Sequence, residues 1–299
     1  MTEENHNKLK FSTQAERIKN GIKQSNKKAH ISTEKTETDT SRTITPPLND
    51  RTLIIDGDIL IYKVAAQCEQ VTDWGNDLWT LHSDFEEAKT KLADTIYYYE
   101  TTLISKRVVM ALGGKNNFRK RINPDYKSNR KATRKPTVYN PLRKWVEENY
   151  KCISFDGLEG DDIMGILGTS DDIIKGVKTL LTSDKDLKTI PATHWFLGDD
   201  DYTIINEFEA DYNHMFQTLT GDVTDGYKGC PTIGKVTAAK ILDPVKDNVK
   251  SMWRAVVSTF ISKGLTDRDA IREARMARIL RSTDFNFETK KPILWSPPV

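Results

Sequence analysis

Cysteine and histidine are scarce in this chain of 299 residues, which contains three cysteines and five histidines. Cys68, Cys152 and Cys230 lie far apart, without the close spacing of a zinc site or the density of a disulfide scaffold. Since no two histidines show a paired spacing such as HxxxH, a zinc hydrolase is not expected. We expect reduced, structural thiols, and we expect carboxylates to be the ligands of any bound metal ion.

Long apolar runs are also lacking. No stretch approaches the roughly 18 apolar residues of a membrane helix, and the first residues contain no apolar segment of the kind that a signal peptide needs. The sequence therefore predicts no membrane association and a cytoplasmic location. With 37% apolar residues, the chain can still bury a substantial core.

Composition divides the chain into three parts. Residues 1–49 are rich in Lys, Thr, Ser, Asn and Glu, and they bury too little to order themselves, so we expect a mostly disordered extension. A partner-binding role, for example toward a replication protein, stays open for this extension. Residues 50–206 alternate between strand and helix patterns, and residues 207–299 read as helical.

The alternating part begins with an apolar run at residues 52–56 that ends on Asp56, as a buried parallel strand does when it delivers a carboxylate to the sheet edge. Further strands are predicted at residues 107–112, 151–155 and 177–182, and helices at residues 86–102, 138–149 and 159–167. This alternation predicts an α/β fold with a mainly parallel central sheet flanked by helices. Such sheets bind ligands at the carboxyl ends of their strands.

Acidic residues recur at these strand ends and helix starts. Each cluster alone has a plain structural explanation, because an acid in the first turn caps a helix and interacts favourably with its dipole. Together, however, they would repel one another without a cation between them. Hard carboxylate ligands suit magnesium or manganese, and two such ions support phosphodiester hydrolysis. The clusters are Asp56 with Asp58, Glu159-Gly160-Asp161-Asp162, Asp184-Lys185-Asp186 and Asp222-Val223-Thr224-Asp225.

A basic segment separates the first two acidic clusters. Between Lys115 and Lys135 it carries nine Lys and Arg against the single acid Asp125, and it includes the aromatic residues Phe118 and Tyr126. A charge run is often only a solvated surface, but its place after a strand that ends near the acids favours nucleic-acid contact. Tyr126 is predicted to stack on a terminal base, with ordinary packing as the alternative.

A glycine-containing turn from Gly229 to Gly234 leads into a helix that begins near Lys235. Backbone amides at such a turn bind phosphate without reading sequence. A plain packing role for the two helices and their turn is the alternative.

These segments resemble the 5′-nuclease (flap endonuclease) superfamily, and within it the exonucleases of T7-like bacteriophages. The resemblance runs in family order from about Thr52 to the C-terminus. It rests on the segments LIIDGD, NFRKRINPDYKSNRK, LEGDDIMGIL, LLTSDKDLKTIP, FQTLTGDVTDGYKG and MARILR. It implies a metal-dependent 5′→3′ exonuclease and flap endonuclease that acts on duplex DNA, and on RNA primers in RNA–DNA hybrids, in phage replication and recombination.

The resemblance also implies roles for single residues. Asp184 and Asp186 are expected to be catalytic, with Lys127 and Arg130 steering the scissile phosphate. Residues 113–137 would form a basic loop, and residues 222–242 a helix-three-turn-helix motif that can hold a potassium ion; we expect a monomer. Two magnesium or manganese ions would be held by Asp56, Glu159, Asp161, Asp162, Asp184, Asp186, Asp222 and Asp225. DNA would be bound by Arg119, Lys120, Tyr126, Lys127, Arg130, Lys131, Gly229, Gly234 and Lys235.

One departure bears on activity. Shortly before Arg119 the family usually has an aspartate, whereas this chain has Gly114. A protein that binds branched DNA without cutting it is therefore an alternative. A second alternative is a haloacid-dehalogenase-type phosphatase, in which Asp56 of the Asp56-Gly57-Asp58 segment would be a covalent nucleophile, although this leaves the basic segment and the glycine turn unexplained.

Overall fold

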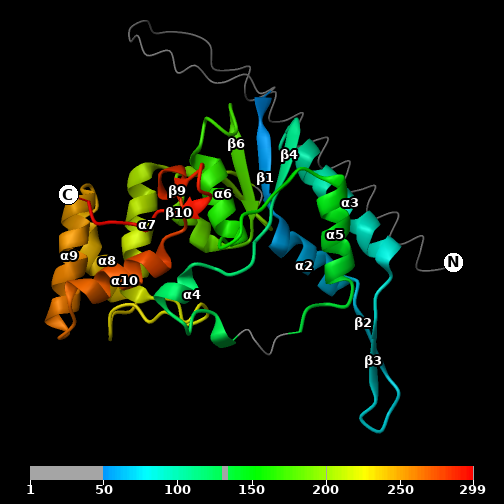
Figure 1. The fold of residues 1–299 in the computed structure, drawn as a ribbon, viewed down its shortest axis with the longest axis horizontal. Coiled ribbons are helices and arrows are strands. Elements are labelled where there is room, and N and C mark those ends of the chain that lie inside the picture. The colour runs from blue at the N-terminus through cyan, green and yellow to red at the C-terminus, as the bar shows by residue number, and fades with distance from the viewer. Residues whose placement is uncertain (1–49, 130–133, 200, 299) are drawn as a thin grey trace, which may run out of the picture. The chain divides into compact units, whose positions relative to one another are not determined.

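The computed structural model describes residues 50–129, 134–199 and 201–298 (Figure 1). The prediction of disorder for residues 1–49, and the roles predicted for Arg130 and Lys131, concern residues outside these ranges.

A six-stranded sheet forms the centre of the described structure, with the strand order β5-β4-β1-β6-β7-β8. The strands pair in parallel except for the edge strand β8, which is antiparallel to β7. The predicted α/β fold with a mainly parallel sheet is confirmed. The strands are β1 (Thr52–Asp56), β4 (Arg107–Ala111), β5 (Cys152–Ile153), β6 (Lys178–Thr182), β7 (Ala192–Phe196) and β8 (Thr203–Ile205).

Both faces of the sheet are covered, as the wholly buried strand β1 requires. Because successive side chains of a strand point to opposite faces, Leu53 and Ile55 pack into one core and Ile54 into another. The first core is closed by α2 (Gly57–Gln67), α3 (Phe85–Thr102) and α5 (Tyr139–Asn149), and the second by α6 (Gly160–Thr169). These helices lie on the two sides of the sheet in Figure 1.

The C-terminal part is mainly helical and packs around a core of its own. It consists of α7 (Glu207–Thr220), α8 (Lys235–Leu242), α9 (Val249–Ser262) and α10 (Asp267–Ala277), followed by the short pair β9 (Phe285–Asn286) and β10 (Lys291–Pro292). The loop between α7 and α8 contains the glycine turn, and α7 contacts the short helix η3 (Lys185–Thr189) that follows β6. The helical part is thereby brought against the acid-bearing end of the sheet.

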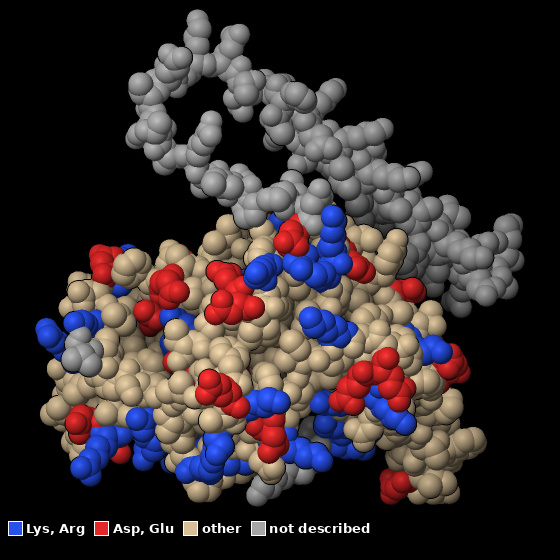
Figure 2. Space-filling model, turned by 45° about the horizontal axis from the view of Figure 1, so that its top comes forward, with Lys and Arg blue, Asp and Glu red and all other residues tan. Residues whose placement is uncertain are grey.

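A two-stranded hairpin of β2 (Gln70–Asp73) and β3 (Trp79–His82) stands away from the sheet (Figure 1). Every residue of both strands is exposed. The sequence analysis did not predict this hairpin. On the face drawn in Figure 2, basic and acidic side chains are interspersed. No helix among the described residues has the length and apolar character needed to cross a membrane.

Candidate active site

Asp56 ends the central strand β1 and is 3% exposed. Its Oδ1 accepts a hydrogen bond from the Ile59 amide (3.0 Å), which caps α2, and its Oδ2 accepts one from the Thr182 hydroxyl (3.0 Å). Burial raises the pKa of Asp56 to about 7, and the negative charges of Asp58 and Asp184 raise it further against those hydrogen bonds. The negative charges of Asp58 and Asp184 therefore lie close to the buried carboxyl group of Asp56.

Asp161 and Asp184 complete what we call the first acidic group, with Asp56. Burial raises the pKa of Asp161 well above its ordinary value, followed by the charges of Asp56 and Asp184. Asp184 lies at the end of β6 and caps η3 through the Asp186 amide (2.9 Å). The carboxyl ends of the neighbouring strands β1 and β6 and the start of α6 thus bring these three acids together, as the sequence predicted.

Asp186, Asp222 and Asp225 form a second acidic group. The pKa of Asp186 is raised to about 7, first by burial and then by Asp184, Asp222 and Asp225. Asp222 and Asp225 belong to the loop after α7, where the Asp222 carboxylate accepts a hydrogen bond from the Thr224 amide (2.7 Å). Asp184 therefore acts electrostatically on both groups.

The chemistry of these donors fits hard divalent cations, because oxygen ligands are gathered where burial and neighbouring carboxylates raise the pKa of Asp56, Asp161 and Asp186. Among the described residues, however, no three His, Cys, Asp or Glu side chains have an arrangement that could hold a metal ion as they stand. Binding would require the carboxylates to turn toward the ion.

Asp162 has a different role from the one predicted. It is fully buried, and Arg119 binds both its oxygens at 2.7 and 2.8 Å. The Leu280 amide donates to Oδ1 (3.2 Å) and the Glu159 amide to Oδ2 (3.1 Å). Since both oxygens accept two hydrogen bonds, the prediction that Asp162 binds metal is wrong for this structure. Its carboxylate instead joins α6 to the C-terminal segment.

Glu159 lies beside the first acidic group and forms ion pairs with two cations, Arg119 and Lys127. Lys127 Nζ donates to its Oε1 (2.6 Å), and the Tyr126 hydroxyl donates to its Oε2 (2.7 Å). Burial alone would raise the pKa of Glu159, but Arg119 and Lys127 outweigh it and lower the pKa to about 2. Lys127 also lies 3.4 Å from the Asp225 carboxylate. The ammonium group of Lys127 is thus held between Glu159 and Asp225, and its role in steering the phosphate stays a prediction.

Tyr126 does not present its ring for stacking, and that predicted role is wrong for this structure. The residue is 3% exposed and packs in a small core with Tyr227, Met276 and Ala277. Its hydroxyl contacts Glu159 and, at 3.2 Å, Asp225. The ring therefore supports the acids from within, which corresponds to the alternative of ordinary packing.

The basic segment is divided between the interior and the surface. Arg119 is 2% exposed and donates to Asp162 and to the carbonyl oxygens of Met276 and Arg278. A guanidinium committed in this way cannot contact DNA, so that prediction is wrong for Arg119. Lys120 is exposed and open to contact.

The glycine turn is divided in the same way. Gly229 is buried, its amide donates to Glu273 (2.8 Å), and a Cβ there would lie 2.3 Å from the Gly221 nitrogen. Its amide cannot also bind phosphate, so the predicted DNA contact of Gly229 is wrong. Gly234 caps α8, and both it and Lys235 are exposed. The phosphate contact predicted at the start of α8 stays a prediction.

Gly114 occupies a position that admits no side chain. Its amide donates to the Leu158 carbonyl (2.9 Å), and a Cβ would lie 2.1 Å from the Phe155 carbonyl oxygen. The carboxylate next to this loop is that of Asp58, whose Oδ2 accepts from the Gly113 amide (2.6 Å). The close approach of the backbone at Phe155 thus requires glycine at position 114.

The sequence analysis missed the partners of Asp58. Arg143 and Tyr139 both donate to its Oδ1, and Arg143 also donates to the Gly113 carbonyl (2.9 Å). Tyr139 and Arg143 are four residues apart on α5, so they share a helix face. That spacing was a signal, but only the fold shows that the face meets Asp58.

Comparisons with known proteins identify the family of this chain. A model of the family described as "5'-3' exonuclease, N-terminal resolvase-like domain" matches residues 51–216. The chain is 31% identical to the exodeoxyribonuclease of Enterobacteria phage T3, over 82% of this chain and 92% of that protein. It is 33% identical to the exonuclease of Escherichia phage T7, over 82% and 93%.

Solved structures support the fold alone. The T5 flap endonuclease in complex with DNA and metal ions aligns with a TM-score of 0.59 at 13% identity, covering 78% of this chain and 90% of that one. The T5 5′-exonuclease with bound zinc gives 0.59 at 14% identity, over 76% and 89%. From the family match and the phage relatives together, the chain belongs to the 5′-3′ exonuclease family and is an exonuclease of the phage type.

Proposed function

We propose that this exonuclease hydrolyses phosphodiesters from the 5′ ends of duplex DNA, cuts 5′ flaps and removes RNA from RNA–DNA hybrids, with two magnesium or manganese ions as cofactors. The observation that carries the proposal is the first acidic group, in which burial and the charge of Asp184 raise the pKa of both Asp56 and Asp161. Such repulsion is relieved by a cation. The DNA and metal ions of the T5 flap endonuclease complex are consistent with it.

The residues around the acids have distinct tasks. When bound, the cations supply activation of water and stabilisation of the departing oxygen. Asp56, Asp161 and Asp184 would hold one ion, and Asp186, Asp222 and Asp225 the other. Lys127 turns from Glu159 toward the phosphate as the strand enters, because a phosphodiester anion competes with the carboxylate for its ammonium group.

DNA outside the reacting phosphate is held by surface groups. Lys120 contacts the strand, and Gly234 and Lys235 present the exposed start of α8 to a phosphate of the duplex. The helix-three-turn-helix at residues 222–242 and a potassium ion on its carbonyl oxygens are parts of this proposal. A monomeric enzyme, and a replication-protein partner for residues 1–49, stay predictions.

Product length over time tests the cleavage. A 5′-recessed duplex, a 5′-flap duplex and an RNA–DNA hybrid, each labelled at the 3′ end, are incubated with magnesium or with EDTA. We expect magnesium-dependent shortening from the 5′ end, and strong loss of turnover in Asp184→Ala with DNA affinity retained. Asp172→Ala, at an exposed acid before β6, is the matched control. Shortening in EDTA, or by Asp184→Ala at the full rate, would contradict the proposal.

The non-cleaving alternative is favoured by one observation, the glycine at position 114 in place of the usual aspartate. The same experiment decides it, since DNA affinity without cleavage of any substrate would support it. The phosphatase alternative has no such support, because it leaves the basic segment unexplained and the family match over residues 51–216 is to the 5′-3′ exonucleases.

A further inference from the structure

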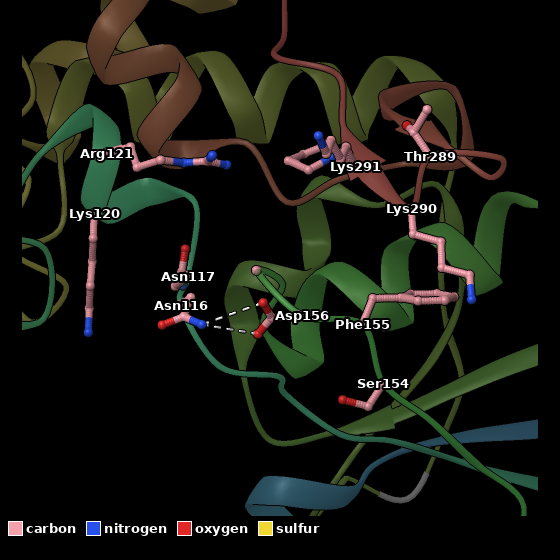
Figure 3. A pocket seen from close by; sticks show the side chains of 12 residues that line it. Asn116, Asn117, Lys120, Arg121, Ser154, Phe155, Asp156, Thr289, Lys290 and Lys291 are labelled. Carbon is pink, nitrogen blue, oxygen red and sulfur yellow. Dashed lines mark hydrogen bonds between the residues drawn. The ribbon is translucent and has the colours of Figure 1, made fainter.

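A pocket of about 830 Å³ opens beside the basic segment. Three segments that are distant in sequence form it: the turn leading into α4 (Arg119–Ile122), the loop after β5, and the turn between β9 and β10. Figure 3 shows Lys120 and Arg121 on one side, Lys290 and Lys291 on the other, and Asn116 and Asp156 between them. We call this site the basic pocket.

The charge of the basic pocket is strongly positive. Four cationic side chains line it, against the single acid Asp156, which accepts long hydrogen bonds from the Asn116 amide at 3.4 and 3.5 Å. Within the described ranges, none of the four cations forms a salt bridge. Cations gathered without counter-charges favour an anionic ligand, and the volume is that of a small-molecule or nucleotide site.

The direction of the side chains separates this pocket from the acids. Arg119 points inward to Asp162, whereas the next two residues, Lys120 and Arg121, line the pocket on the outside of the same short helix. The opposite wall comes from the turn between β9 and β10, which lies outside the basic segment. Phe155 adds an aromatic wall, and its ring packs against Phe285 with centroids 5.0 Å apart.

We propose that the basic pocket binds a phosphate group of the substrate or product, at a distance from the acids, through Lys120 and Arg121 on one side and Lys290 and Lys291 on the other. Because no residue of the two acidic groups lines the pocket, it could hold one phosphate while another is cleaved. The choice of a nucleic-acid phosphate as the ligand rests on the proposed function, whereas the location of the site rests on the pocket alone. Two sources supply such a phosphate: the backbone of the DNA strand and the released nucleotide.

The test measures binding without cleavage. The affinity of a duplex oligonucleotide is determined by fluorescence anisotropy in EDTA over a range of salt concentrations. The variants are Lys290→Ala/Lys291→Ala, Lys120→Ala/Arg121→Ala and the quadruple variant. The matched control is Lys106→Ala/Lys175→Ala, two exposed lysines that precede β4 and β6 at the other end of the sheet. All substituted side chains are exposed, so thermal unfolding should be unchanged.

For a strand phosphate in the pocket, we expect each double variant to weaken duplex binding about tenfold and to lower the salt slope by about one. The quadruple variant should lose much less than the product of the two effects, because both pairs hold one phosphate. The control should bind as the unchanged protein does. Effects that simply multiply would show general attraction of DNA by separate charges and overturn the pocket.

A second titration, with deoxyadenosine 5′-monophosphate, distinguishes the source of the phosphate. If the double variants lose binding of this nucleotide and keep duplex affinity, the pocket holds the released product. If both ligands bind to every variant as to the unchanged protein, the proposal is wrong. No part of this experiment involves cleavage. Failure of the nuclease proposal would therefore be seen separately in the cleavage assay, if the unchanged protein binds DNA but does not shorten it.

Discussion

The Cβ position of Gly114 lies 2.1 Å from the carbonyl oxygen of Phe155, so the two backbone segments meet where the usual aspartate would project its side chain. The Gly114 amide is also bound, to the Leu158 carbonyl. Glycine here is therefore part of how the loop after β4 packs on the loop after β5. An acid cannot be restored at this position without moving one of these loops.

Gly114→Asp is accordingly predicted to destabilise the protein and not to raise its activity. Overpacking against a backbone atom costs about 1–3 kcal/mol. Gly114→Ala should therefore also lower the free energy of unfolding, because its Cβ meets the same backbone atom without adding a charge. Chemical denaturation measures this effect. Lys115→Ala, at the neighbouring exposed position, is the control, because surface substitutions change stability by less than about 0.5 kcal/mol. Full stability together with higher turnover in Gly114→Asp would show that the loop adapts.

Much of the sheet was predictable because a parallel strand that is buried on both faces has a continuous apolar sequence. Residues 52–56 were predicted as a strand and form β1 with the same bounds. Helices α3, α5 and α6 and the start of the C-terminal helical part at Glu207 were also located to within a few residues, whereas α2 was not predicted. The β2–β3 hairpin was missed because its residues are all exposed and therefore carry no burial pattern.

In the site, residue types predicted which side chains lie near the acids, but not which of them are already bound by other residues of the protein. Asp161 and Asp162 are adjacent acids in one helical turn, yet one faces the acidic group and the other is enclosed by Arg119. Only the packing of the C-terminal segment, which brings Leu280 to Asp162, separates their roles. Likewise, the sequence cannot tell that Tyr126 faces inward, since an aromatic in a basic segment suits either a core or a stacked base.

Arg119 and Asp162 form a buried pair, and breaking it should be costly. Removing one partner leaves an uncompensated charge in the interior, at a cost of about 3–5 kcal/mol. We expect Arg119→Met to lower the free energy of unfolding by that amount in urea denaturation. Lys120→Met, at the neighbouring exposed position, should change it by less than about 0.5 kcal/mol. Similar effects at both positions would mean that the pair is not buried in solution.

Lys127 is predicted to act on turnover more than on binding. Its ammonium lies between Glu159 and Asp225, where it meets the phosphate only after the strand has entered. Removing a charged donor from a reacting group costs about 10²–10³ in turnover. Lys127→Met should therefore lower kcat by that factor with DNA affinity within a few fold, as measured by single-turnover cleavage and anisotropy. Lys135→Met, in the same segment but beside Tyr139, is the control, and an equal loss there would remove Lys127 from the site.

The raised pKa values of the acids predict how stability varies with pH in the absence of metal. Asp56 and Asp186 have a folded pKa of about 7, above the 3.8 of a free side chain. Between about pH 4 and 7 the unfolded chain has lost a proton that the folded protein keeps, so each group makes stability fall as the pH rises. The buried His194 and His214, whose pKa values are lowered mainly by burial, act in the opposite direction below about pH 6.5.

Comparison with Asp56→Asn cancels the histidine contribution, because asparagine resembles the protonated acid and does not titrate. In EDTA, the variant should gain stability relative to the unchanged protein as the pH rises through this window, by up to about 1.4 kcal/mol per pH unit. Adding magnesium near pH 7 should stabilise the unchanged protein and have less effect on the variant, since a cation bound only to the folded state shifts the equilibrium by mass action. Urea denaturation at several pH values measures both effects. A stability difference that does not vary with pH would mean that Asp56 is already ionised in the metal-free protein, and that the first acidic group is less crowded than the structure indicates.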